Sequence, residues 1–406
     1  MSKLPESPLP IFDTLDSLEQ RASPLPDYVN KADYEVSRDF LLAYRDSPDT
    51  FHSYRRDVDR FLQWVYLIAL MDIKRIGRQD IENYIRFCQR PPASWIATKM
   101  VPRFIASEGV LQPNPDWRPY VAKVSKEAHL HGKKPSVKKY RLSDKGIQAT
   151  LRILSTYFSF LEIEDYIQVN PVKRIRQKSR LVRSLSKQEP IRRLSDVQWD
   201  YVIETAELMA EENPDHERTL FIMSALYGMY LRISELADTA LWSPMMKHFY
   251  QDADGNWWFK TVGKGNKERD ITVSSDMLKA LKRYRQAYGL TALPSPADSL
   301  PLIPKHKGRG GLSSTRQLRE IVQGCFDETI YRLKKDGMES EADGLKSATV
   351  HWLRHTGISD DVKKRPKEHV RDDAGHSSSA TTDRYIDIEK RERHASAKRK
   401  KLRPIE

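Results

Sequence analysis

The stretch His351-Trp-Leu-Arg354-His355-Thr, followed by Gly375-His376-Ser377 and then by Tyr385, decides how the whole chain is interpreted. His351 and Arg354 are three positions apart, so a helix would place both side chains on one face. With the second His and the Tyr, they have the chemistry of a phosphate pocket beside a nucleophile. Each feature alone has a simpler explanation, because a His–Arg pair is commonly a solvated helix end and a single Tyr commonly belongs to a core.

The two histidines His351 and His355 also have the spacing of a zinc-binding helix. Trp352 stands where the metalloprotease motif has its Glu, and no third ligand is evident in the sequence. We therefore expect no zinc at this position.

Two upstream segments supply the remaining charged residues. They are Leu231-Arg232-Ile-Ser-Glu235-Leu236 and Val262-Gly-Lys264-Gly-Asn-Lys267-Glu-Arg269. The glycines of the second segment do not have the spacing of a nucleotide-binding phosphate loop. The combined order is Arg, Lys, His, Arg, His, Tyr. This order and spacing resemble the catalytic domain of the tyrosine recombinase, or phage integrase, family. The resemblance is strong over the C-terminal half and looser before it.

The resemblance implies both a fold and a reaction. The expected fold is mainly α with a small antiparallel β-sheet, in which an N-terminal helical core-binding domain precedes an α+β catalytic domain. The expected activity is that of a site-specific DNA recombinase, or integrase. The Tyr385 hydroxyl would attack a DNA phosphodiester, giving a 3′-phosphotyrosyl link and a free 5′-hydroxyl. A 5′-hydroxyl from another strand would then reverse the step without ATP.

The residue types suit this chemistry. Arginine is planar, permanently charged and able to hold phosphate oxygens through two donors, whereas imidazole donates hydrogen bonds or accepts a proton near neutral pH. The resemblance assigns protonation of the departing 5′-oxygen to Lys264, with Lys267 as the alternative, and an orienting role to Glu235. The expected catalytic residues are Arg232, Lys264, His351, Arg354, His376 and Tyr385. No metal or other cofactor is expected, because the guanidinium pair neutralises the phosphate.

Two other classes of protein fit parts of the pattern. A type IB topoisomerase shares the chemistry, but the helical domain and the Leu-Arg-Ile-Ser-Glu-Leu segment argue against it. A DNA-binding protein without catalysis is disfavoured because all six positions are filled. Expected partners are double-stranded DNA sites and a tetrameric synapse of this chain, with accessory DNA-bending proteins or a second recombinase as optional partners. Two inserts favour a mobile-element integrase over resolution of replicon multimers.

Size and composition agree with a DNA-binding protein of two domains. The chain has 406 residues and a net charge of +13, which favours a polyanionic partner. Cys88 and Cys325 are too few for a disulfide framework, so a reducing bacterial cytoplasm is the simplest compartment. The N-terminus has no apolar core typical of a signal peptide, and no apolar run is long enough to cross a membrane.

The predicted domain order follows composition and periodicity. It is a mobile leader over 1–36, a helical core-binding (SAM-like) domain over 37–171 with an insert at 91–141, a basic linker over 172–193, and a catalytic domain over 194–406 that ends in a basic tail. We predict helices from Pro48, around 80–88 and from Ser143, each with an apolar face. We assign no role to the insert.

Two groups of basic residues are candidates for contact with DNA phosphates. Arg55, Arg56 and Arg60 lie off the apolar face of the first helix, and they would equally serve to solvate it. Lys173, Arg174 and Arg176 lie in the linker, where they would add salt-dependent affinity for the backbone.

The catalytic domain has a clear pattern of elements with one departure. A capping box at Ser195 starts a helix, a buried helix over 219–230 leads to Arg232, and three short strands are expected at 248–250, 257–262 and 268–273. Helical patterns return at 275–288 and 317–333. The family has an apolar helix pair between the second Arg and Gly-His, but residues 358–374 are strongly polar here.

Overall fold

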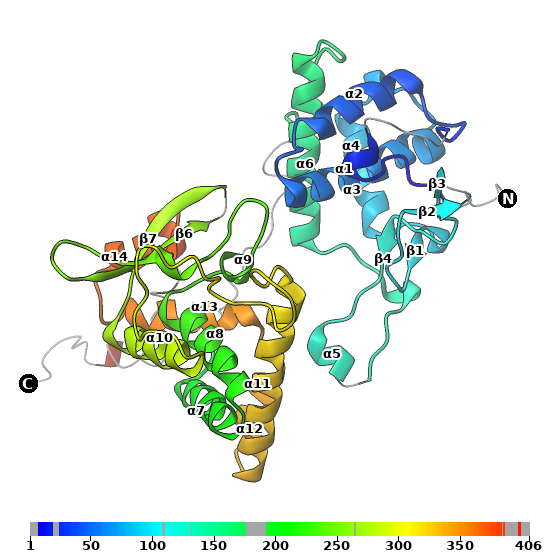
Figure 1. Ribbon diagram of the computed structural model, residues 1–406. Helices are drawn as coiled ribbons and strands as arrows, with labels where there is room; N and C mark the ends of the chain where they lie inside the picture. The colour runs from blue at the N-terminus through cyan, green and yellow to red at the C-terminus, as the bar shows by residue number, and fades with distance from the viewer. Residues whose placement is uncertain are drawn as a thin grey trace, which may run out of the picture. The chain divides into compact units, whose positions relative to one another are not determined.

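The computed structural model describes residues 7–18, 24–107, 110–130, 132–175, 192–263, 265–383, 385 and 397–398. The chain divides into two compact units, Met1–Gln188 and Glu189–Glu406 (Figure 1). The structure is mainly helical with a small antiparallel sheet in the second unit, which confirms the expected fold class.

The first unit is built from helices around an aromatic core. The helices are α1 (Leu15–Leu18), α2 (Lys31–Leu42), α3 (Pro48–Trp64), α4 (Arg78–Gln89), α5 (Lys126–Leu130) and α6 (Asp144–Ile163). Phe61 of α3 is fully buried, and its ring centroid lies 5.2 Å from that of Tyr84 on α4 and 5.3 Å from that of Phe158 on α6. The predicted helices from Pro48, around 80–88 and from Ser143 are therefore confirmed, and their apolar faces meet in one core.

The start of the chain differs from the expected mobile leader. Ile11 and Phe12 are fully buried, and the Phe12 ring stacks on Tyr34 of α2. Helix α2 already begins at Lys31. The segment lacks a helical period, but apolar residues in an extended segment can still pack against helices that cover them. Local periodicity does not detect such packing.

The insert at 91–141 contains short strands. β1 (Ile96–Ala97) pairs in parallel with β4 (Tyr120–Val121), and β2 (Phe104–Ser107) pairs antiparallel with β3 (Val110–Pro113). Trp95 and Tyr120 are fully buried in the core of the first unit. The insert is thus attached to the helices through its aromatic residues.

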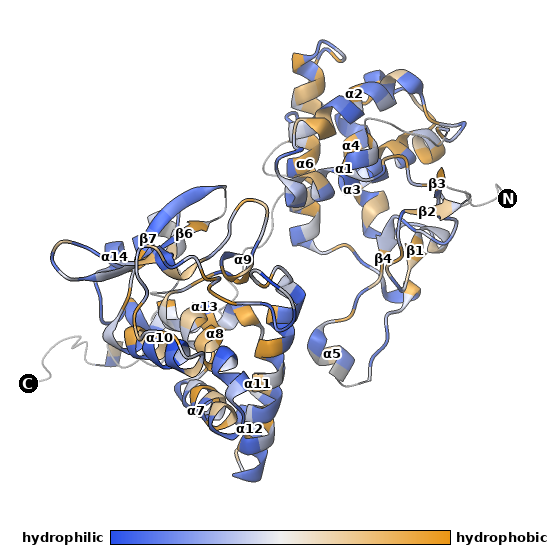
Figure 2. Ribbon diagram, in the orientation of Figure 1, coloured by the Kyte–Doolittle hydropathy of each residue, from blue (hydrophilic) through white to orange (hydrophobic). Residues whose placement is uncertain are grey.

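The second unit packs helices around the central helix α8. The helices are α7 (Asp196–Glu212), α8 (Glu217–Gly228), α9 (Ile233–Leu236), α10 (Ser275–Ala287), α11 (Thr315–Lys335), α12 (Glu339–Lys346), α13 (Val350–Asp361), α14 (Lys367–Ala374) and α15 (Ser379–Asp383). Strands β5 (Phe249–Gln251), β6 (Trp257–Gly263) and β7 (Lys267–Thr272) form an antiparallel sheet in that order. Figure 2 shows polar and apolar residues alternating along α11, as expected for a helix with one face in the core.

Sequence signals account for these elements. Ser195 and Gln198 form the predicted capping box at the start of α7. The three predicted strands and the buried helix before Arg232 are present. Gly357 of α13 lies so close to α8 that a Cβ there would come within 2.1 Å of the Tyr227 carbonyl oxygen. This close approach brings α13, with His351 and Arg354, next to the segment that carries Arg232.

Candidate active site

A buried carboxylate lies between two arginines at one side of the site. Arg232 precedes α9, and its backbone N–H and Nη1 both donate to Glu235, each at 2.8 Å. Arg269 of β7 donates from Nη1 and Nη2 to the two carboxylate oxygens, at 2.9 and 2.8 Å. Burial of Glu235 acts to raise its pKa, but the hydrogen bonds and charge of Arg269 outweigh it and lower the pKa. Glu235 is therefore ionised and fixes the direction of Arg232.

Arg269 also joins the sheet to the turn that carries His376. Its Nε donates to the Asp373 carbonyl oxygen at 3.0 Å. A Cβ at Gly375 would lie 2.9 Å from Arg269 Cδ, and a Cβ at Gly263 would lie 2.7 Å from Arg269 Nη1. Both glycines leave room for this guanidinium, and Gly375 additionally has a left-handed φ of +63°.

Arg354 is held from both sides by carbonyl oxygens. Only 2% of it is exposed. Its Nη1 donates to the Tyr230 carbonyl, and Nη2 donates to that of Ala374 at 2.5 Å. Tyr230 has a left-handed φ of 50° where the chain leaves α8. Burial, and then the nearby positive charge of Arg232, lower the pKa of Arg354 to about 10, so its guanidinium stays charged at neutral pH.

His351 and His376, both predicted from the sequence, lie near the positive charges of Arg232 and Arg354. Burial lowers the pKa of His351, and the charges of Arg354 and Arg232 lower it further. The same causes, with Arg269 added, lower the pKa of His376 to about 4. His376 Nδ1 also lies 2.9 Å from Thr382 Oγ1. Both imidazoles are therefore neutral at neutral pH, which allows them to accept a proton or donate one hydrogen bond.

Tyr385 lies among the histidines. Its ring centroid is 5.7 Å from that of His376, with the planes nearly parallel, and 5.3 Å from that of His355. The Tyr385 hydroxyl is 2.5 Å from His355 Nδ1. The His351 and His355 rings meet edge to face at 4.1 Å. The sequence motifs assign no catalytic role to His355, although its i+4 spacing from His351 places both residues on one helix face.

The structure thus brings together Arg232, His351, Arg354, His376 and Tyr385, which come from the residue before α9, from α13 and from the segment after α14. Lys264 lies outside the described residues. Its neighbours Gly265 and Asn266 have positive φ values of +78° and 55°, as expected for the predicted hairpin turn. The alternative, Lys267, is the first residue of β7 and is paired with Gly263 across the hairpin.

The polar segment 358–374 is organised by ion pairs. Arg365 bridges Asp361, at 3.3 Å, and Asp373, at 2.6 Å. Asp373 also accepts hydrogen bonds from the backbone and side chain of Thr272. A small apolar cluster lies beneath, formed by Tyr230, Ile358, Val370 and Ala374. Charged residues therefore connect α13 and α14 to the sheet, in keeping with the strongly polar sequence of this segment.

The basic residues expected to contact DNA occupy different surroundings. The Arg60 side chain is 14% exposed, donates to the Pro119 carbonyl at 2.7 Å and lies over the Tyr120 ring, so it holds the insert. Arg55 donates to the Asp13 carbonyl. Arg56 and Lys173 are more exposed and pair with Asp57 and Glu162. Arg174 borders a small pocket of the first unit, and Arg176 lies outside the described residues.

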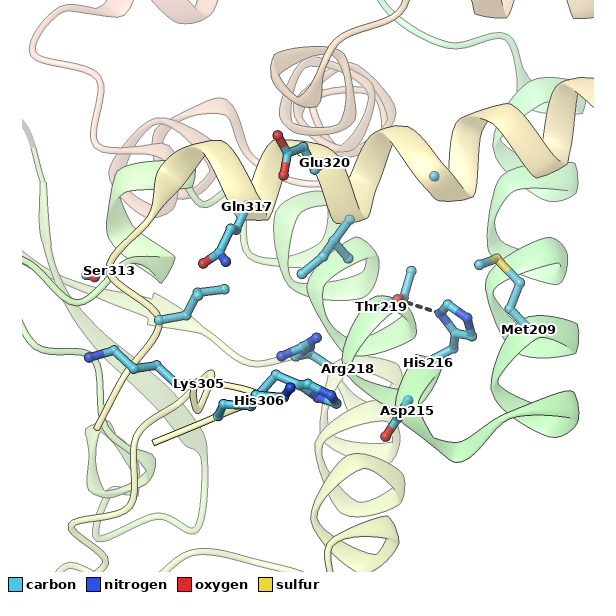
Figure 3. Close-up of a pocket in the computed structure, with 14 residues that line it drawn as sticks. Met209, Asp215, His216, Arg218, Thr219, Lys305, His306, Ser313, Gln317 and Glu320 are labelled. Atoms are coloured by element: carbon cyan, nitrogen blue, oxygen red, sulfur yellow. Dashed lines mark hydrogen bonds between the residues drawn. The ribbon is translucent and has the colours of Figure 1, made fainter. Parts of the chain in front are cut away.

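Two cavities contain none of the expected catalytic residues. One of about 790 Å³ in the first unit is lined by Arg55, Arg56 and Arg60 together with basic residues of the insert, Lys99, Arg103, Arg118, Lys123, Lys134, Lys139 and Arg141. The other, of about 670 Å³, lies between the start of α8, the start of α11 and the loop at 305–313 (Figure 3). Arg218, Lys305 and His306 face this second cavity.

Comparisons with known proteins show which families and structures the chain resembles. Residues 201–392 match the sequence model of the phage integrase family. The tyrosine recombinase XerC of Thermodesulfovibrio yellowstonii is 27% identical over 243 residues, which cover 59% of this chain and 70% of that protein. The XerC of Actinobacillus pleuropneumoniae is 27% identical over 278 residues, which cover 65% and 76%.

A solved structure agrees in fold. The XerH site-specific recombinase, bound to palindromic difH substrate in a post-cleavage complex, superposes with a TM-score of 0.54 at 15% identity, covering 95% of this chain and 94% of that one. The segment that matches the family model lies within the second unit. Residues 201–392 are therefore similar to the tyrosine recombinase, or phage integrase, family. Within the described residues, every helix is too short or too polar to cross a bilayer.

Proposed function

We propose that this protein is a site-specific DNA recombinase whose Tyr385 cuts and rejoins DNA through a 3′-phosphotyrosyl intermediate. The observation that carries the proposal is the position of the Tyr385 hydroxyl, which lies among His355, His376 and the buried guanidinium of Arg354. A phosphodiester brought to this hydroxyl would be surrounded by permanently charged donors.

The proposed reaction assigns a role to each side chain. The phenolic oxygen forms a bond to phosphorus while the bond from phosphorus to the 5′-oxygen breaks. Arg232 and Arg354 stabilise the extra negative charge on the non-bridging oxygens, because fixed donors act strongly where water is excluded. His351, beside both arginines, adds a hydrogen bond to the same oxygens. Lys264 supplies the proton to the departing 5′-oxygen.

The wider role follows from the same proposal. We infer that both units bind double-stranded DNA, with the basic cavity of the first unit facing the phosphate backbone. The working form would be a tetramer of this chain on two DNA sites, assisted where needed by DNA-bending proteins or a second recombinase. The insert at 91–141 and the long connection before α11 support a mobile-element integrase.

Covalent capture of DNA tests the proposal. A pool of nicked duplexes with a randomised central segment is incubated with the protein, and covalently attached DNA is recovered and sequenced. We expect one sequence family to be enriched, and we expect Tyr385→Phe to bind the selected duplex without forming an adduct. Tyr331→Phe is the matched control, because Tyr331 is 63% exposed on α11. Adduct formation by Tyr385→Phe at the wild-type level contradicts the assignment of the nucleophile, and attachment without sequence enrichment favours a topoisomerase.

A further inference from the structure

The hydroxyl of Tyr385 is hydrogen-bonded to a histidine that was not among the expected catalytic residues. His355 follows Arg354 on α13, and its Nδ1 lies 2.5 Å from the Tyr385 hydroxyl oxygen. The rings approach with centroids 5.3 Å apart. His355 is half-buried, so its ring is partly shielded from water. A short hydrogen bond from a phenol to an imidazole nitrogen is the geometry that proton transfer to a general base requires.

The two expected histidines are placed for other tasks. His376 stacks face to face on Tyr385, with an angle of 17° between the planes, and its Nδ1 is engaged by Thr382 Oγ1. Stacked rings do not direct a ring nitrogen at the hydroxyl. The positive charges of Arg354 and Arg232, the pair that would hold the phosphate, act on His351 and lower its pKa. Its position therefore favours contact with a phosphate oxygen.

We infer that His355 is the general base that removes the proton from the Tyr385 hydroxyl during DNA cleavage. This inference rests on the proposed function of Tyr385 as the nucleophile.

The proposed step balances in atoms and charge. Neutral His355 carries its ring proton on Nε2 and accepts the phenolic proton at Nδ1, becoming an imidazolium. The oxygen–hydrogen electron pair of Tyr385 forms the new bond to phosphorus. The electron pair of the breaking bond goes to the 5′-oxygen, which takes a proton from the acid proposed above, Lys264. In the rejoining direction His355 returns its proton to the leaving tyrosinate.

The two histidines of α13 have different proposed partners: His351 contacts the phosphate and His355 contacts the Tyr385 hydroxyl. His351 and His355 are one helical turn apart, so they project from the same face with their rings in contact. Arg354 lies between them in sequence and points into the protein toward Tyr230 and Ala374. One helix therefore presents a phosphate-side imidazole and a tyrosine-side imidazole to the same reaction.

Single-turnover cleavage of the DNA selected by covalent capture tests the assignment. His355→Asn keeps a polar group near the position of Nδ1 but removes the basic nitrogen. We expect adduct formation to slow by about 100- to 10,000-fold, the usual contribution of a general base, while affinity for the duplex stays unchanged. His369→Asn is the matched control, because His369 is exposed on α14, and it should cleave at the wild-type rate.

Chemical rescue separates a base from a structural residue. Added imidazole should raise the cleavage rate of His355→Ala in proportion to its concentration, because the small base can occupy the vacated space. Cleavage by His355→Asn at the wild-type rate, or rescue of His351→Ala but not of His355→Ala, overturns the inference and leaves Tyr385 as nucleophile. If the wild-type protein forms no adduct that depends on Tyr385, the proposed function itself fails.

Discussion

Arg269 forms a two-point ion pair with Glu235, in which both terminal guanidinium nitrogens donate to separate carboxylate oxygens at 2.9 and 2.8 Å. Glu235 is 1% exposed and also accepts a hydrogen bond from Nη1 of Arg232. Two-point pairs of this kind fix direction as well as charge. Arg269 of β7 therefore holds the carboxylate that orients Arg232, and the same Arg269 supports the turn that precedes His376.

Replacing the Glu235 carboxylate should destabilise the protein, because Arg232 and Arg269 both pair with it. Glu235→Gln removes the counter-charge of two largely buried guanidiniums, so we expect the free energy of unfolding to fall by about 3 kcal/mol, the order found when one partner of a buried pair is removed. Urea unfolding measures the change. Glu320→Gln is the control, because Glu320 pairs with Arg316 on the exposed face of α11. An equal loss in both variants would show that the Glu235 pair has no special role.

Gly375→Ala adds only one methyl group, but we expect it to lower both stability and the rate of DNA cleavage. An alanine there must adopt a left-handed φ, which costs about 1 kcal/mol, and its Cβ would meet Arg269 Cδ at 2.9 Å. We expect lower stability together with slower DNA cleavage, because Arg269 must shift away from Glu235. Gly324→Ala, on α11 with open space around it, should leave cleavage unchanged. Unaltered cleavage by Gly375→Ala would count against the coupling of this turn to Arg269.

The charge state of His376 gives a pH prediction. Its pKa is lowered from 6.5 to about 4 by burial and by the arginines, so the unfolded chain binds this proton more readily than the folded protein. Stability should therefore fall as the pH drops from about 6.5 to about 4. Nitrogen NMR of the imidazole should show His376 neutral until the lower end of that range. His376→Gln should flatten the loss of stability, whereas His369→Gln should not. Protonation of His376 near pH 6.5 would contradict its burial beside the three arginines.

Local sequence signals predicted much of the second unit. The Ser195 capping box, the apolar run before Arg232 and the short strand predicted at 257–262 each depend on residues close in sequence, so they could be recognised without a structure. The burial of Ile11 and Phe12 could not, because it depends on helices that follow much later in the chain. The ion pairs of Arg365 likewise replace an apolar contact that no periodicity would indicate.

By itself, the sequence indicated the resemblance to tyrosine recombinases, the order of the elements and a set of candidate catalytic residues, because motifs and local backbone preferences depend on residues close in sequence. Only the tertiary structure decided which imidazole meets the Tyr385 hydroxyl and that Arg269 pairs with Glu235, the carboxylate that accepts hydrogen bonds from Arg232. Hydrogen bonds form over a few ångströms and in fixed directions, so His355 and Arg269 acquire their partners only when α13, β7 and the C-terminal segment are packed together.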